Sequence, residues 1–65
     1  MNFNFNKDEF EYLVDKCMLN EEMKNIFEMK IKGYSITQMS LELKMSESSI
    51  NRRINKLKKK IKRVI

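Results

Sequence analysis

The 65-residue chain contains no histidine, no proline and no tryptophan, and it has only one glycine and one cysteine. Without histidine and with a single cysteine, it lacks the ligand sets of the usual zinc sites and the imidazole of nucleophile–histidine catalysis. Cys17 has no second cysteine for an internal disulfide, which favours a reducing compartment. We therefore expect a protein that is not an enzyme, uses no cofactor or metal, and is cytoplasmic.

The length and the residue types together predict the fold class. A chain this short encloses one small core, so residues 1–65 are expected to form a single domain. Because proline is absent and Lys, Glu, Met, Leu and Ile are abundant, the composition predicts an all-α fold. No apolar run reaches transmembrane length and no signal peptide is evident, so we expect no membrane partner.

Positive charge is concentrated in the second half of the chain, which carries a formal net charge of +5 overall. Residues 1–34 hold five basic and seven acidic residues, whereas residues 35–65 hold nine basic and only two acidic residues. This asymmetry is typical of nucleic-acid binders, in which Lys and Arg neutralise phosphates. The alternative for the Lys-rich end is a solvated helix face or a solubility tail.

Capping residues and apolar periodicity predict two helices in the first half. Asn6 and Glu9 have the spacing of a capping box, which predicts a helix from Lys7 to about Met18. Asn20 predicts the cap of a second helix, from Glu21 to about Lys32, with Gly33 as its left-handed stop.

Two more helices are predicted in the second half. Ser35 and Gln38 resemble a capping box for a short helix over about 36–44, and Ser46 is suited to cap a helix that begins at Glu47. From there one apolar stripe extends the last helix almost to the end of the chain, through Ile50, Ile54, Leu57, Ile61 and Val64. The sequence thus predicts a small four-helix domain.

A short capped helix, a brief turn and a long basic helix indicate a helix-turn-helix whose second member is the recognition helix. The small Ser40 suits the helix crossing and Met45 suits the turn. At 100° per residue, the side of the last helix opposite Ile50 carries Ser48, Arg52, Asn55 and Lys59. These side chains are compatible with contacts to base edges and phosphates.

Residues 19–61 resemble the LuxR/GerE-type DNA-binding domain and its relative, region four of sigma factors. The resemblance is carried by Leu19-Asn20-Glu21-Glu22, by Gly33, Ser35, Gln38, Met39 and Ser40, and by Ser46, Ser49 and Ile50. It implies sequence-dependent binding of duplex DNA, with phosphate contacts from the first helix of the motif. Residues 1–18 are then an N-terminal extension and helix, and residues 19–65 are the LuxR/GerE-like core.

The chain departs from that pattern at three points. Ser40 replaces the usual alanine, and Lys44 replaces a frequent turn glycine, at a cost of about 1 kcal/mol if it is left-handed. A Lys-rich extension replaces the further helix that forms the dimer contact in the LuxR/GerE type, so its dimer geometry does not carry over. The N-terminal segment, with Phe3, Phe5, Phe10 and Leu13, is expected to take the structural place of that helix.

We expect a small bacterial or phage-type transcription regulator, nucleoid-associated, whose recognition helix, about 47–62, enters the major groove. Base-contacting candidates are Ser48, Ser49, Asn51, Arg52 and Asn55. Phosphate-contacting candidates are Tyr34, Ser35, Thr37, Gln38, Ser46, Arg53, Lys56, Lys59, Lys60 and Arg63. The alternative for the first group is an ordinary solvated helix face. No small-molecule ligand is evident.

Two other functions stay open, and so does the oligomeric state. One is a protein-interaction adaptor that docks on RNA polymerase or another regulator through its acidic half or its C-terminal apolar stripe. The other is a DNA-packaging or recombination accessory factor of a mobile element. The stripe continues through Leu57, Ile61, Val64 and Ile65 beyond any groove, which leads us to expect a second copy as its cover, and hence a homodimer.

Overall fold

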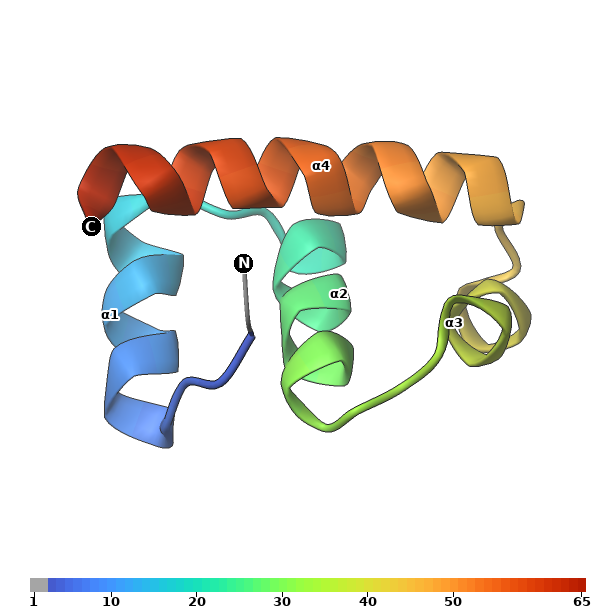
Figure 1. Cartoon of the computed structure of the whole chain (residues 1–65), viewed down its shortest axis with the longest axis horizontal. Coiled ribbons are helices and arrows are strands. Elements are labelled where there is room, and N and C mark those ends of the chain that lie inside the picture. The colour runs from blue at the N-terminus through green and yellow to red at the C-terminus, as the bar shows by residue number, and fades with distance from the viewer. Residues whose placement is uncertain (1–2) are drawn as a thin grey trace.

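The computed structural model describes residues 3–65, and these form four α-helices with no strand (Figure 1). The helices are α1 (Lys7–Lys16), α2 (Glu21–Ile31), α3 (Ile36–Leu43) and α4 (Glu47–Val64). This confirms the predicted all-α fold and the position of each helix along the chain. None of the four is long and apolar enough to cross a membrane.

Each helix begins at the capping residue that the sequence predicts. The Asn6 and Glu9 pair forms a complete capping box, as the Ser35 and Gln38 pair does, with hydrogen bonds of 2.8–3.1 Å. Asn20 and Ser46 accept hydrogen bonds from backbone amides in the first turns of α2 and α4. These side chains satisfy amides that have no carbonyl partner within their own helix, which fixes where each helix begins.

The first three helices end one or two residues earlier than the sequence predicts, and left-handed backbone is the reason. Met18 has φ 53°, Gly33 has φ 87° and Lys44 has φ 54°. Gly33 takes this conformation without steric cost, whereas Met18 and Lys44 carry a Cβ that crowds the backbone there. Each left-handed residue turns the chain out of the preceding helix.

Helix α4 forms the spine of the molecule and packs against all three other helices. In Figure 1 it extends along the long axis, with α1 near its C-terminal end, α2 near its middle and α3 near its N-terminal end. Its buried side chains are Ile50, Ile54, Leu57 and Ile61. They join two apolar clusters, one with Ile26 and Met39 and one with Leu13, Cys17, Met23 and Phe27.

The expectation that the C-terminal stripe of α4 needs cover from outside the chain is wrong. Leu57 and Ile61 are fully buried within the chain, in the same cluster as Leu13 of α1 and Phe27 of α2. Only Ile65, 73% exposed, lies largely open. The stripe therefore leaves little apolar surface for a second copy or for another protein to cover. This removes the argument from the stripe for a homodimer and for an adaptor that docks there.

The N-terminal segment helps to provide that cover. The rings of Phe3, Phe5 and Phe10 surround Phe27, with centroid distances of 6.0, 5.7 and 5.0 Å. Such aromatic pairs add about 0.5–1.5 kcal/mol each beyond the burial of their surface. The segment thus completes the core on which α4 rests.

Candidate nucleic-acid interface

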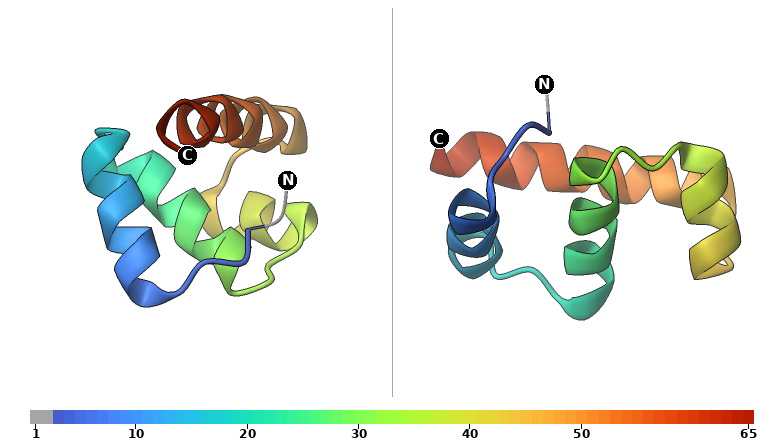
Figure 2. Two further views of the ribbon diagram at one scale, coloured as in Figure 1. Left: turned by 60° about the vertical axis from the view of Figure 1, so that its left-hand side comes forward. Right: turned by 90° about the horizontal axis from the view of Figure 1, so that it is seen from below.

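The face of α4 that points away from the other helices is exposed along its whole length (Figures 1 and 2). Because Ile50, Leu57 and Ile61 fix the buried side, the opposite side is presented in one orientation. The exposed residues include the base-contacting candidates Ser48, Asn51, Arg52 and Asn55 and the basic residues Lys56, Lys59, Lys60, Lys62 and Arg63.

The turn between α3 and α4 is fixed by hydrogen bonds around one small side chain. Ser40 donates from Oγ to the backbone oxygen of Met45 over 2.6 Å, and the Met45 amide donates back to the Ser40 carbonyl over 3.1 Å. Lys44 between them adopts the left-handed conformation. A glycine or alanine in place of Ser40 would leave the Met45 carbonyl without the hydroxyl donor.

Hydroxyl groups at the start of α4 bind one another. Ser46 accepts a hydrogen bond from the Ser49 amide over 3.1 Å and donates to Ser49 Oγ over 2.9 Å. Arg52 donates from Nη2 to the same Ser49 oxygen over 3.3 Å. The two serines are therefore occupied locally, and Ser49 holds the Arg52 guanidinium near the first turn of α4.

The three other base-contacting candidates make no side-chain hydrogen bond to any of residues 3–65. Ser48, Asn51 and Asn55 are exposed, and their hydroxyl and amide groups face solvent. Their donors and acceptors can therefore bind an external partner without breaking an internal contact.

The phosphate-contacting candidates divide into two groups. Ser35 and Gln38 belong to the capping box of α3, Thr37 donates a hydrogen bond to Glu47, and Tyr34 is half-buried. By contrast, four basic side chains on α4 are exposed and form no ion pair within residues 3–65: Lys56, Lys59, Lys60 and Arg63. Among these candidates, the exposed cations without an ion pair therefore all lie on α4.

Arg53 has a partner that sequence reasoning missed. Its Nε forms an ion pair with Oε1 of Glu22 at the start of α2. From the sequence alone, a glutamate in the first turn of a helix indicates only a favourable interaction with the helix dipole. No sequence signal marks the pair, since it depends on how α2 crosses α4.

A polar hollow of about 310 Å³ adjoins this ion pair, between the start of α2 and one flank of α4. Its walls are formed by Asn20, Glu22, Met23, Arg53, Lys56 and Lys60. Three cationic side chains therefore meet one carboxylate, which leaves the hollow positively charged. The flank of α4 that carries it lies next to the outward face.

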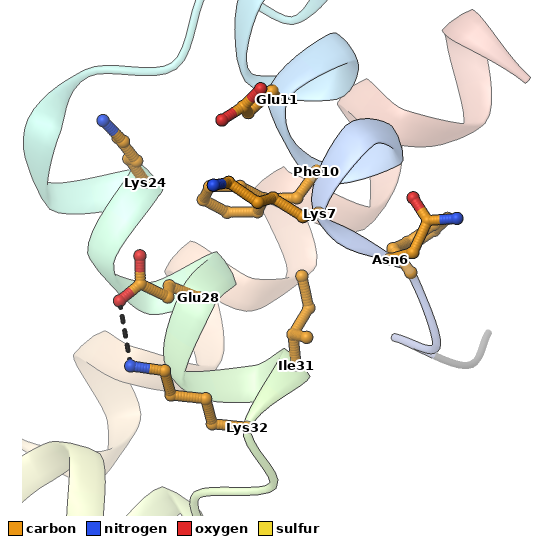
Figure 3. Close-up of a pocket in the computed structure, with 9 residues that line it drawn as sticks. Asn6, Lys7, Phe10, Glu11, Lys24, Glu28, Ile31 and Lys32 are labelled. Carbon is orange, nitrogen blue, oxygen red and sulfur yellow. Dashed lines mark hydrogen bonds and ion pairs between the residues drawn. The ribbon is translucent and has the colours of Figure 1, made fainter.

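A separate groove of about 510 Å³ lies between α1 and α2, away from the outward face of α4 (Figure 3). Phe5, Phe10 and Ile31 supply its apolar surface, and charged side chains from both helices, including Glu28 with its ion-pair partner Lys32 at 3.2 Å, surround it. Residues 3–65 contain no group of three or more His, Cys, Asp or Glu side chains placed to hold a metal ion.

Comparisons with family models, with curated proteins and with solved structures find no match to this chain. The resemblance to the LuxR/GerE-type domain therefore stays a prediction from the sequence.

Proposed function

We propose that the protein binds duplex DNA with α3 and α4 as a helix-turn-helix, and that residues 47–62 of α4 lie in the major groove. The observation that carries this proposal is the outward face of α4, where Arg52 and Asn55 stand exposed opposite the buried side chains of the same helix. The major groove of B-DNA, about 12 Å wide, admits an α-helix. Arg pairs well with guanine and Asn with adenine.

The way α4 is held supports reading of base edges. Base contacts require side chains whose backbone does not shift relative to the groove. Helix α4 is fixed by side chains at both ends of its buried stripe, Ile50 near α3 and Ile61 near α1. The Ser40 and Met45 hydrogen bonds fix the turn that precedes it.

Basic side chains on α4 supply the sequence-independent part of the affinity. Lys56, Lys59, Lys60 and Arg63 are exposed and form no ion pair within the described residues 3–65. Each Lys or Arg that neutralises a phosphate releases condensed counterions and makes binding weaker at higher salt. If these four contact phosphates, a plot of log affinity against log salt has a slope of about −3.6.

Under this proposal the protein is a small transcription regulator, similar to LuxR/GerE-type domains, that acts by occupying a DNA site. The test is selection of bound sequences from random duplex DNA, followed by fluorescence anisotropy between about 50 and 200 mM salt. We expect an enriched consensus and a steep loss of affinity with salt. A twofold-symmetric consensus would indicate that two copies pair on DNA despite the buried stripe.

Two other results of these experiments would indicate a different function. Steep salt dependence without an enriched consensus would indicate a sequence-independent DNA protein, such as a packaging or recombination factor. No binding to any duplex would remove the proposal and leave a protein-interaction adaptor.

A further inference from the structure

The hollow between α2 and α4 contains more positive charge than its one carboxylate balances. Arg53, Lys56 and Lys60 line it from α4, and Glu22 lines it from α2. The two lysines form no ion pair with any of residues 3–65. An anion in this hollow would therefore meet two lysine ammonium groups that are free of internal ion pairs. It would compete with Glu22 only for the Arg53 guanidinium.

The guanidinium of Arg53 is neutralised by Glu22 but is not fully satisfied. Arg53 Nε pairs with the Glu22 carboxylate, yet this buried nitrogen has no well-directed hydrogen bond. The two side chains remain 35% and 44% exposed, so the pair is screened by water and is weak. Arginine can bind a phosphate through two parallel hydrogen bonds, whereas Glu22 supplies an ion pair without a hydrogen bond to Nε, so a phosphate could add bonds that Glu22 does not make.

We propose that the hollow receives a backbone phosphate of DNA, and that Glu22 occupies Arg53 until that phosphate displaces it. The inference rests on the proposed DNA binding, because it places one DNA strand along the flank of α4 that carries the hollow. Glu22 is then an internal competitor that weakens binding to every sequence. The phosphate must break this ion pair in order to bind Arg53. Because a partly exposed pair is weak, the competition should lower the DNA affinity by only about two- to fivefold.

The competition is tested with two variants that remove the same charge from the same helical turn. Glu22→Gln removes the carboxylate that pairs with Arg53, whereas Glu21→Gln is the matched control, because Glu21 is exposed in the first turn of α2 and makes no ion pair within residues 3–65. We expect Glu22→Gln to tighten binding to the selected duplex about two- to fivefold more than Glu21→Gln does. The extra gain should vanish when Arg53→Gln is added, because no guanidinium is left to release.

Equal gains from the two glutamate variants would overturn the competition and show only long-range repulsion between carboxylates and DNA. The wild-type protein would still bind duplex DNA in that case, so the proposed function would stand. Loss of all duplex binding in the wild type would instead remove the proposed function together with this inference.

The NMR resonance of the Arg53 Nε–H group gives a second readout, which does not depend on a change in DNA affinity. In the wild-type protein we expect this resonance to shift on addition of the duplex, because its partner changes from carboxylate to phosphate. In free Glu22→Gln it should differ from that of the free wild type. An unshifted Arg53 resonance in a complex whose α4 amides do respond would overturn the inference.

Discussion

Thr37 on α3 donates a hydrogen bond from Oγ1 to Oε2 of Glu47 on α4 over 3.1 Å. These residues lie in the first turns of their helices, so the bond joins the two helix starts across the turn between them. Glu47 also stands where the dipole of α4 favours a negative charge. The hydroxyl of Thr37, a candidate phosphate contact from the sequence, thus has a structural partner in the free protein.

This contact predicts that Thr37→Val lowers the free energy of unfolding by about 0.5–1 kcal/mol, because Val keeps the branched shape and removes the donor. Thr37→Ser retains the hydroxyl and should stay closer to the wild type. Urea denaturation followed by circular dichroism measures both. Equal stability of the Val and Ser variants would show that the exposed hydrogen bond contributes nothing.

At the three left-handed positions, a change to glycine should stabilise the fold and a change from glycine should destabilise it. Met18→Gly and Lys44→Gly should each raise the unfolding free energy by up to about 1 kcal/mol, because glycine relieves the Cβ crowding at φ 53° and 54°. Gly33→Ala should lower it by a similar amount through backbone strain alone, since an added Cβ would meet nothing within 4 Å.

Thermal melts of the three variants measure these changes, and Lys44→Ala is the control that removes the charge while keeping the Cβ. If Lys44→Gly is no more stable than Lys44→Ala, the left-handed backbone at residue 44 is not strained.

Local signals explain why the helices could be predicted from the sequence. Asn6, Ser35 and Ser46 act within three residues of themselves, so their capping bonds depend on sequence spacing alone. The spacing of Ile50 and Leu57 likewise predicts which side of α4 is buried. It does not state which element buries it, and the expectation that a second copy must cover the stripe was wrong for that reason, while the homodimer itself stays a prediction.

The candidate interface could be predicted only in part, for a related reason. The outward position of Arg52 follows from helical geometry. The partners of Arg53 and Thr37 depend on how α4 crosses α2 and α3, and no spacing within one helix encodes that angle. Interactions within a helix are therefore readable from this sequence, and ion pairs between helices are not.

Cys17 predicts a loss of stability in alkaline solution. Burial raises the pKa of its thiol above the ordinary value of 9.0, and the positive charge of Lys60 only partly opposes this shift. As pH rises above that value, the unfolded state releases the thiol proton first, so the folded state is disfavoured. At neutral pH both states hold the proton and the thiol contributes no pH dependence.

Urea denaturation at several pH values between about 7 and 10 tests this linkage. Cys17→Ala should be less stable throughout, because it removes a buried side chain, but its stability should fall less over the alkaline range. Parallel curves for the two proteins would show that the thiol does not titrate differently on folding.

Lys59 predicts a loss of DNA affinity that does not depend on sequence. Lys59→Ala should weaken binding to the selected and to random duplexes alike, and it should reduce the magnitude of the salt slope by about one. Lys7→Ala is the matched control, because it removes the same charge from the start of α1, far from the outward face of α4. An unchanged slope in Lys59→Ala would place Lys59 away from the phosphates.

Arg52 predicts the opposite signature, a loss that is confined to the preferred site. Its guanidinium is exposed opposite the buried stripe, so Arg52→Ala should leave the fold intact and remove only a 3.3 Å surface contact with Ser49. If Arg52 pairs with a guanine, Arg52→Ala loses about 1–3 kcal/mol of binding free energy on the selected duplex and much less on random DNA.

Arg52→Lys keeps the charge without the planar pair of donors, so it should retain binding to random DNA while losing preference for the site. Anisotropy titrations on both duplexes measure the difference, and an equal loss on both for Arg52→Ala would reassign this side chain from base to phosphate contact.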